Sequence, residues 1–247
     1  MKLFFIVFCI FFSSYCQAQK IIKAVWTNDT EIVTDVLQAK YLLIIKSYDD
    51  TAFERLDYNF AGPIVSRKMY SDNRLTILNG KYATYYPSGY LAEEGQYIQN
   101  KKDGSWYVFD DTSRAIKEMK YRLDSLVSVT DLDSLHKEKE KLNIEEDTTG
   151  QVEAYYKDGL AGIAKLISKK IVVPERTQVL TNGGTAKIRF VIDTTGAIIN
   201  REVLKSVEFT FDEECMRVIS LLKKWVPAND KGKLVKAYRI QPITVTF

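Results

Sequence analysis

The segment that decides the fold of the C-terminal half spans residues 184–196, GTAKIRFVIDTTG. Apolar and polar side chains alternate along its first part, which is typical of a β-strand with one buried face. The predicted inward positions are Ala186, Ile188, Phe190 and Ile192, with Lys187 and Arg189 pointing outward. The turn-forming residues Asp-Thr-Thr-Gly follow, and the chain returns along residues 198–205. The sequence therefore predicts a β-hairpin here.

Helical spacing flanks this hairpin on both sides. A first helix is expected to end before Pro174 and to bury Leu160, Ile163, Ala164, Ile167 and Ile171. After the hairpin, Asp212 is expected to cap a second helix. The buried face of that helix is predicted to be Cys215, Val218, Ile219, Leu222 and Trp225. A final strand over residues 234–247 contains Pro242, which cannot donate a backbone hydrogen bond and so lies at a sheet edge or bends the strand. The predicted order is αββαβ.

The middle of the chain repeats itself. Three aromatic residues stand at intervals of 27 and 24 residues, and each is followed by a tyrosine twelve positions later. The pairs are Tyr58 with Tyr70, Tyr85 with Tyr97, and Phe109 with Tyr121. Each unit is predicted to form strand, turn and strand, with turns at residues 87–89 and 100–104 in the second unit. Residues 41–47 are expected to join the same sheet, and the aromatic side chains are expected to pack within it rather than bind a ligand.

The first eighteen residues have the pattern of an export signal. Lys2 precedes a ten-residue apolar run at residues 3–12, and small or polar residues follow. A membrane-spanning helix needs about 20 apolar residues, so we expect a cleaved leader rather than a retained anchor. Cleavage would leave Cys215 as the one remaining cysteine, which excludes an intramolecular disulfide and suits a core position.

Composition and motifs exclude several classes of function. The chain has 35 Lys and Arg against 32 Asp and Glu, spread along its length, so no basic patch indicates a nucleic-acid partner. Its single histidine, His136, lies in a charged stretch, which leaves no basis for a triad or a multi-histidine metal site. The sequence also lacks Walker, zinc-protease and nucleophile-elbow motifs. We predict a protein that is not an enzyme and that needs no cofactor or metal.

Two parts of the chain resemble known families. Residues 80–97, GKYATYYPSGYLAEEGQY, followed by KDGSW at 102–106, resemble the MORN-type repeats of exported proteins from Bacteroidetes-like bacteria. Residues 155–247 resemble the TonB C-terminal domain, on the motifs GTAKIRFVID, FDEECMRVI, WVPA and GKLV. Val173 and Cys215 stand where that family usually has Tyr and Ala.

The predicted fold is α+β and has four parts. Residues 1–18 are the signal peptide, and residues 19–121 form an antiparallel β-meander of MORN-like hairpin repeats. Residues 122–154 form a charged linker, in part helical. Residues 155–247 form the TonB-like αββαβ domain.

The resemblance to TonB implies a periplasmic domain that binds an extended peptide. The expected partner is the TonB box of an outer-membrane transporter, or a segment of another envelope protein, added as a strand to the last strand of the sheet. The predicted partner-binding residues, among which Lys236 and Tyr238 would give selectivity, are Val235, Lys236, Ala237, Tyr238, Arg239 and Ile240.

The sequence leaves several functions open. A cleaved leader favours an exported TonB-like binding protein without a link to the proton-motive force. An uncleaved leader would instead favour an anchored energy transducer for TonB-dependent outer-membrane transport. A third hypothesis is an envelope scaffold whose repeats contact peptidoglycan or lipid, and the edge strand could also pair two copies as a homodimer.

Overall fold

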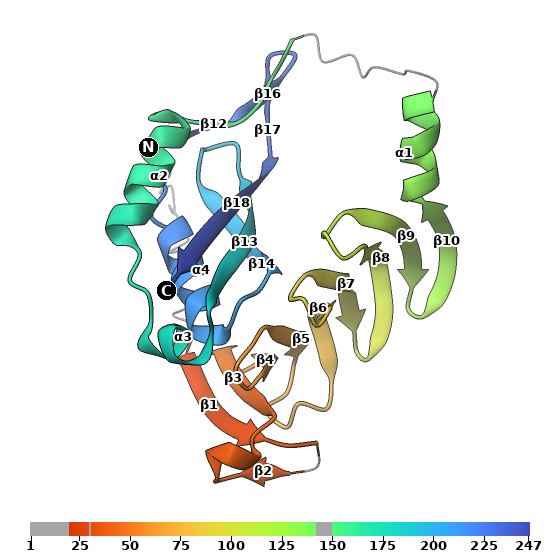
Figure 1. The fold of residues 1–247 in the computed structure, drawn as a ribbon. Helices are drawn as coiled ribbons and strands as arrows, with labels where there is room; N and C mark the ends of the chain where they lie inside the picture. Colours follow the sequence, from red (N-terminus) through yellow and green to blue (C-terminus); the bar gives the residue numbers. More distant parts are fainter. Residues whose placement is uncertain (1–19, 30, 142–149) are drawn as a thin grey trace, which may run out of the picture.

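The computed structural model describes residues 20–29, 31–141 and 150–247. The predicted leader at residues 1–18 lies outside the described residues. In Figure 1 the strands of the N-terminal half follow one another in an arc, and the C-terminal helices and strands lie on the other side of the molecule. The α+β prediction with an N-terminal antiparallel meander is confirmed.

The N-terminal half is one ten-stranded antiparallel sheet, here called the repeat sheet. Its strand order is β10-β9-β8-β7-β6-β5-β4-β3-β1-β2, so nearly all neighbours in sequence are neighbours in space. A short 3₁₀ helix, η1 (Val36–Gln38), precedes β3. The strands are β1 (Lys20–Thr27), β2 (Ile32–Val33), β3 (Tyr41–Asp49), β4 (Ala52–Asn59), β5 (Ile64–Tyr70), β6 (Leu78–Tyr85), β7 (Leu91–Ile98), β8 (Lys101–Phe109), β9 (Ala115–Arg122) and β10 (Ser125–Asp131).

The three sequence repeats are three hairpins whose turns share one pattern of backbone hydrogen bonds. In each turn the residue after the repeat aromatic donates its backbone N–H to the carbonyl of the residue four positions later: Asn59 to Pro63, Tyr86 to Tyr90, and Asp110 to Arg114. The third unit has Ser113 where the second has Gly89, yet both adopt a positive φ, of 67° and 85°. The side chains of the neighbouring Asp110 and Thr112 hydrogen-bond within that turn and support its shape.

Four aromatic side chains of the repeats pack on one another, as predicted, whereas Tyr58 packs on the ring of Phe209 in the C-terminal half. Trp106 is fully buried, and its ring centroid lies 5.1 to 6.3 Å from those of Tyr82, Tyr97 and Tyr121. A side chain at Gly95 would meet the Trp106 ring at 2.2 Å, so the indole lies directly on the backbone of the neighbouring strand. These contacts form an aromatic core within the repeat sheet.

Two local predictions for the repeats were wrong. The second turn of the middle unit is the pair Gln99 and Asn100, both at positive φ, and Gly104 lies within β8 instead of in a turn at residues 100–104. The stretch from residue 122, predicted as a linker, begins with β10, which pairs with β9 and extends the sheet. A helix, α1 (Leu132–Lys141), follows it.

The C-terminal unit (residues 151–247) has the predicted αββαβ order with additions. Its main sheet has the order β14-β13-β18. One face of that sheet buries Ile188, Phe190 and Ile192 against the helices. The elements are β11 (Gln151–Val152), β12 (Tyr155–Tyr156), α2 (Gly159–Lys170), α3 (Glu175–Leu180), β13 (Gly183–Ile192), β14 (Ile198–Lys205), α4 (Phe209–Ile219), β15 (Trp225–Val226), β16 (Ala228–Asp230), β17 (Lys233–Val235) and β18 (Ala237–Thr246).

Asp212 does not cap the second helix of this unit. The cap is Glu208, whose carboxylate accepts a hydrogen bond from the backbone N–H of Phe211, and α4 begins three residues before Asp212. Cys215 is fully buried in the core, as predicted. Burial raises the pKa of the Cys215 thiol, which suppresses the reactive thiolate.

The two halves of the chain pack on each other at the turns of the repeats. The backbone N–H of Ser206 donates to the carbonyl of Gly89 at 2.9 Å, and the N–H of Ile64 donates to the Ser206 hydroxyl at 3.0 Å. The Ser113 hydroxyl donates to the Leu204 carbonyl, also at 3.0 Å. Leu204 is buried against apolar side chains of the repeat sheet, so apolar contact supports these bonds.

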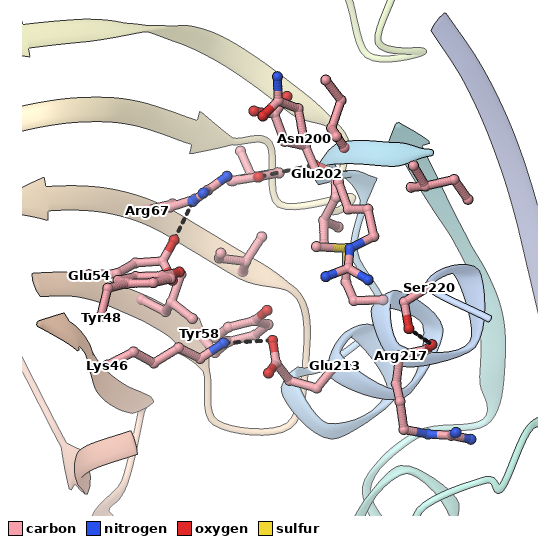
Figure 2. Close-up of a pocket in the computed structure, with 18 residues that line it drawn as sticks. Lys46, Tyr48, Glu54, Tyr58, Arg67, Asn200, Glu202, Glu213, Arg217 and Ser220 are labelled. Carbon is pink, nitrogen blue, oxygen red and sulfur yellow. Dashed lines mark hydrogen bonds and ion pairs between the residues drawn. The ribbon is translucent and has the colours of Figure 1, made fainter. Parts of the chain in front are cut away.

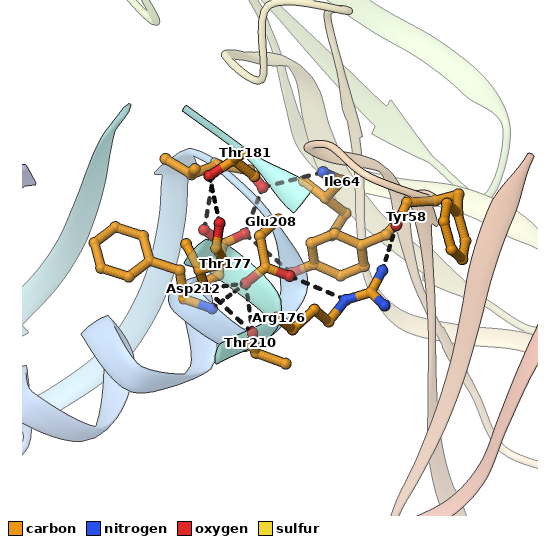
Figure 3. A network of polar contacts seen from close by, with 12 residues as sticks. Tyr58, Ile64, Arg176, Thr177, Thr181, Glu208, Thr210 and Asp212 are labelled. Carbon is orange, nitrogen blue, oxygen red and sulfur yellow. Dashed lines mark hydrogen bonds and ion pairs between the residues drawn. The ribbon is translucent and has the colours of Figure 1, made fainter. Parts of the chain in front are cut away.

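A buried polar network extends this interface (Figure 3). The Ser206 and Tyr58 hydroxyls both donate to the Asp212 carboxylate, the latter at 3.1 Å. Beside it, Glu208 accepts from the Thr177 hydroxyl at 2.5 Å and pairs with Arg176, whose guanidinium also donates to the Phe60 carbonyl in the repeat sheet. Buried polar groups with partners of this kind fix one relative position of the two halves.

The polar face of the predicted hairpin is the other part of the interface. Arg189, predicted to point outward from the core of its own unit, bridges Glu94 of β7 and Glu202 of β14, each at 2.5 Å. Lys81 of β6 also pairs with Glu202. Burial alone would raise the pKa of Glu202, but the charges and hydrogen bonds of Lys81 and Arg189 outweigh it and lower that pKa to about 2.

The contact at Gly89 predicts a specific loss of stability. A Cβ there would lie 2.4 Å from the Ser206 carbonyl oxygen, and φ is already 85°. Gly89→Ala is expected to lower the free energy of unfolding by about 2 kcal/mol, measured by urea denaturation. Gly232→Ala is the matched control, because Gly232 has a similar φ of 90° but a Cβ there would meet nothing within 4 Å. Equal losses in both variants would rule out the Ser206 contact as the cause.

The buried carboxyl of Asp212 predicts a pH dependence. Burial raises its pKa to about 7, and Glu208 adds to this, while hydrogen bonds from Ser206, Val207 and Tyr58 act in the opposite direction. In the unfolded chain the pKa is about 3.9, so the folded state holds the extra proton between these values. The free energy of unfolding is therefore expected to fall by about 1.4 kcal/mol per pH unit as pH rises from about 4 to 7.

Urea denaturation across this pH range tests the assignment to Asp212. The Asp212→Asn variant is expected to lose this part of the slope, because an amide does not titrate. Asp193→Asn is the control, since hydrogen bonds from Thr195 lower the pKa of Asp193 in an exposed turn. An unchanged slope in Asp212→Asn would contradict the assignment.

Candidate functional site

The last strand of the C-terminal unit has one free edge. β18 pairs with β13 along its whole length, from Gly183 opposite Thr246 to Ile192 opposite Ala237, without a bulge. On its other side, no strand among residues 20–29, 31–141 and 150–247 pairs with it. Pro242 lies within this strand, opposite Lys187, which agrees with the predicted edge position.

Side-chain contacts show which backbone groups face the free edge. The carbonyl of Tyr238 accepts a hydrogen bond from the Arg239 guanidinium, and the carbonyl of Pro242 accepts one from the Gln241 amide. Backbone groups of a strand alternate in direction with period two, so Ile240, midway between them, also presents its N–H and C=O outward. The edge can therefore offer a ladder of hydrogen bonds to an added strand.

A groove runs beside this edge. It consists of two hollows of about 280 and 290 Å³, and Glu153 and Arg239 line both. The larger hollow has a mainly aromatic and aliphatic lining, formed by Tyr155, Tyr156, Leu160, Ile163, Phe190, Trp225 and Ile240. We call these two hollows the edge groove.

Arg239 holds the far wall of the edge groove in place. Its guanidinium donates to the Ala154 carbonyl at 2.5 Å and pairs with Glu153 at 2.8 Å. The next residues form β12, which pairs with β15, and the ring of Tyr156 packs against Trp225 at 5.4 Å. The groove is thus fixed by the strand that it flanks.

Four of the six predicted partner-binding residues lie on the edge strand. Ala237, Tyr238, Arg239 and Ile240 belong to β18. Val235 does not, because it ends β17 and pairs with Ala228. Lys236 lies between the two strands. Tyr238 and Ile240 are exposed, at 68% and 55%, whereas Ala237 packs against the core.

Sequence reasoning missed the groove residues of β12 and α2. Leu160 was predicted to be buried on the apolar stripe of α2, but its side chain is 83% exposed beside the groove. Tyr155 is 52% exposed there as well. Large apolar side chains that remain exposed around a groove are typical of a binding site.

Leu160 and Ile163 give a direct test of this assignment. Leu160→Ser is expected to change the free energy of unfolding by less than about 0.5 kcal/mol, because the side chain buries little surface. Ile163→Ser, one turn away and buried in the core, is expected to cost about 3 kcal/mol or more. Urea denaturation measures both free energies of unfolding. A large decrease in Leu160→Ser would show that Leu160 contributes to the buried core and would contradict its assignment to the groove.

The edge groove offers backbone hydrogen bonds and apolar contacts to a ligand. Within the described ranges there is no group of three or more His, Cys, Asp or Glu side chains placed to hold a metal ion. No helix in the same ranges is long and apolar enough to cross a membrane.

Comparison with known protein families finds a match in the part of the chain that contains the edge strand β18. Residues 170–247 match the family model described as the Gram-negative bacterial TonB protein C-terminal. The match includes α3, β13, β14, α4 and the whole of β18. No curated protein and no solved structure matches the chain.

Proposed function

We propose that the chain is a TonB-like envelope protein that binds an extended peptide segment on the free edge of β18. The segment would be a TonB-box-like stretch of an outer-membrane transporter, or a segment of another envelope protein. The free, straight edge beside an apolar groove is the observation that carries this proposal. The TonB C-terminal match supports an envelope role connected with transport.

The geometry suits β-strand addition. The outward N–H and C=O groups of Tyr238 and Ile240 would supply main-chain hydrogen bonds, which do not depend on the partner's sequence. Side chains of the added strand alternate between the two faces of the sheet, so every second one would lie toward the edge groove. An apolar or aromatic residue is favoured there by Tyr155, Leu160 and Trp225.

The edge carbonyls are covered in the absence of a partner. The side chains of Arg239 and Gln241 hydrogen-bond to the carbonyls of Tyr238 and Pro242. Such contacts satisfy an open edge and oppose nonspecific strand pairing. An incoming strand would displace them, which favours partners with a good fit to the groove.

The leader and the repeats would determine where the protein acts and how the binding unit is held. A cleaved leader would make the protein periplasmic and leave it to act as a docking protein, and the repeats would be a MORN-type platform for the binding unit. The intact mass of the protein from envelope fractions of its host distinguishes this from an anchored transducer. A start near Gln19 supports the first, and a retained Met1 supports the second.

Ile240→Pro tests the edge directly. Proline removes the outward N–H at this position while the hydrogen bonds of Arg239 and Gln241 to β13 remain. We expect the affinity for a strand-forming peptide to fall by about tenfold or more. Fluorescence anisotropy with the full chain and labelled peptides from the periplasmic N-terminal segments of the host's outer-membrane transporters measures it.

Ile240→Ala is the matched control for this experiment. It keeps the N–H and removes the exposed side chain, so its affinity should stay within about threefold of the original. The melting temperature of each variant shows whether β18 remains folded. Peptide binding that is unchanged in Ile240→Pro would contradict strand addition at this edge.

A further inference from the structure

A second cavity lies between the two halves of the molecule, away from the edge groove. It has a volume of about 480 Å³ and is here called the central cavity. The repeat sheet forms one wall with residues from β3 to β6, and β14 and α4 form the other (Figure 2). Cavities of this size hold small organic ligands in other proteins.

Almost every charged side chain in this cavity has a partner. Lys46, only 3% exposed, pairs with Glu213 at 2.7 Å, and Arg67 pairs with Glu54 at 2.5 Å. Glu202 is held by Arg189 and Lys81, and Arg217 by Glu214 at 2.7 Å. In these ion pairs each positive charge is neutralised by a carboxylate, so they leave no unpaired charge for a ligand to bind.

Arg201 is the exception. It lines the central cavity from β14 and is partly buried. No hydrogen bond or ion pair joins its guanidinium to any residue in the described part of the chain. A guanidinium without such a partner is available to an anion in the cavity, because it forms strong charge-assisted hydrogen bonds with carboxylates and phosphates.

The backbone of β14 is distorted at this residue. Val191 pairs with Ile199 and Arg189 with Glu202, so the two residues Asn200 and Arg201 lie opposite the single residue Phe190. This is a β-bulge, and Asn200 has a φ of 49° within it. A bulge turns a side chain out of the regular alternation, and bulges occur often beside functional sites.

Apolar side chains also line the central cavity, together with its charged and tyrosine side chains. They come from both halves of the chain and are Leu56, Ile64, Ile198, Ile199, Val203 and Met216. A ligand that pairs with Arg201 would therefore place an uncharged body among aliphatic groups. A guanidinium matches a carboxylate with two parallel hydrogen bonds, which favours a carboxylate over a spherical anion.

From these observations we infer that the central cavity binds a small organic acid, whose carboxylate pairs with Arg201 and whose apolar body lies between β14 and the repeat sheet. The site is separate from the edge of β18 and does not depend on the function proposed for that edge. Because both halves form its walls, the ligand would also strengthen their contact.

Isothermal titration of the full chain with three probes tests the ligand class. Octanoate carries both the charge and the apolar body, octan-1-ol lacks the charge, and inorganic phosphate lacks the body. Octanoate is expected to bind at least about tenfold more tightly than the other two. Octan-1-ol binding equally well would overturn the role of the charge, and phosphate binding equally well would overturn the organic-acid class.

Arg201→Gln tests the residue. It is expected to weaken octanoate binding by about tenfold or more. Arg74→Gln, which removes the same charge from an exposed position in the loop between β5 and β6, is expected to leave it unchanged. The melting temperature of Arg201→Gln without ligand should be equal to or above that of the original chain, because no partner is lost. A lower melting temperature would show a structural role for Arg201, and unchanged octanoate binding would place the anion elsewhere; either result overturns the inference.

Discussion

The relative position of the two halves depends on the hydrogen bonds of one serine. The backbone N–H of Ser206 donates to the Gly89 carbonyl, while its hydroxyl accepts from Ile64 and donates to Asp212. All of these groups are removed from water, so each lost partner would leave a buried polar atom unsatisfied. The central cavity and the ion pair between Arg189 and Glu94 also lie between the two halves. The repeat sheet thus acts as a rigid support for the C-terminal unit.

This support also determines which surface of the C-terminal unit is free. Its main sheet has two edges, and the side with β14 meets the repeat sheet through Lys81, Glu94 and Arg189. The helices cover one face of the sheet. The edge of β18 is left open beside its groove, so a strand that adds to the sheet has one place to do so. Packing between the halves would therefore confine the proposed peptide binding to one side of the molecule.

Regular patterns in the sequence predicted most of the fold. The wrong predictions concern residues whose partners lie far away in the chain or whose spacing fits more than one position. The hairpin of β13 and β14 and the repeat strands follow from alternation with period two. Asp212 was misassigned because a carboxylate near a helix start usually caps it, whereas here it bonds across the interface to Tyr58. Lys187 and Arg189 were predicted only to point outward, because charge alone does not show that Arg189 pairs with Glu94 or that Lys187 lies over the ring of Tyr90. For the binding site, the edge strand was predictable from Pro242 and the TonB resemblance, but Leu160 has the same spacing as a core residue, so the groove was not.

The meander has a further consequence for how this protein can change in evolution. The C-terminal unit rests on the turns that follow β4, β6 and β8, near the middle of the sheet, whereas β10 and α1 project away from it (Figure 1). Each hairpin of the sheet contacts chiefly the hairpins next to it, as in other repeat architectures. Hairpins can then be gained or lost at the β10 end without disturbing the docking turns. Homologues of different length would keep the same binding unit on a platform of variable reach.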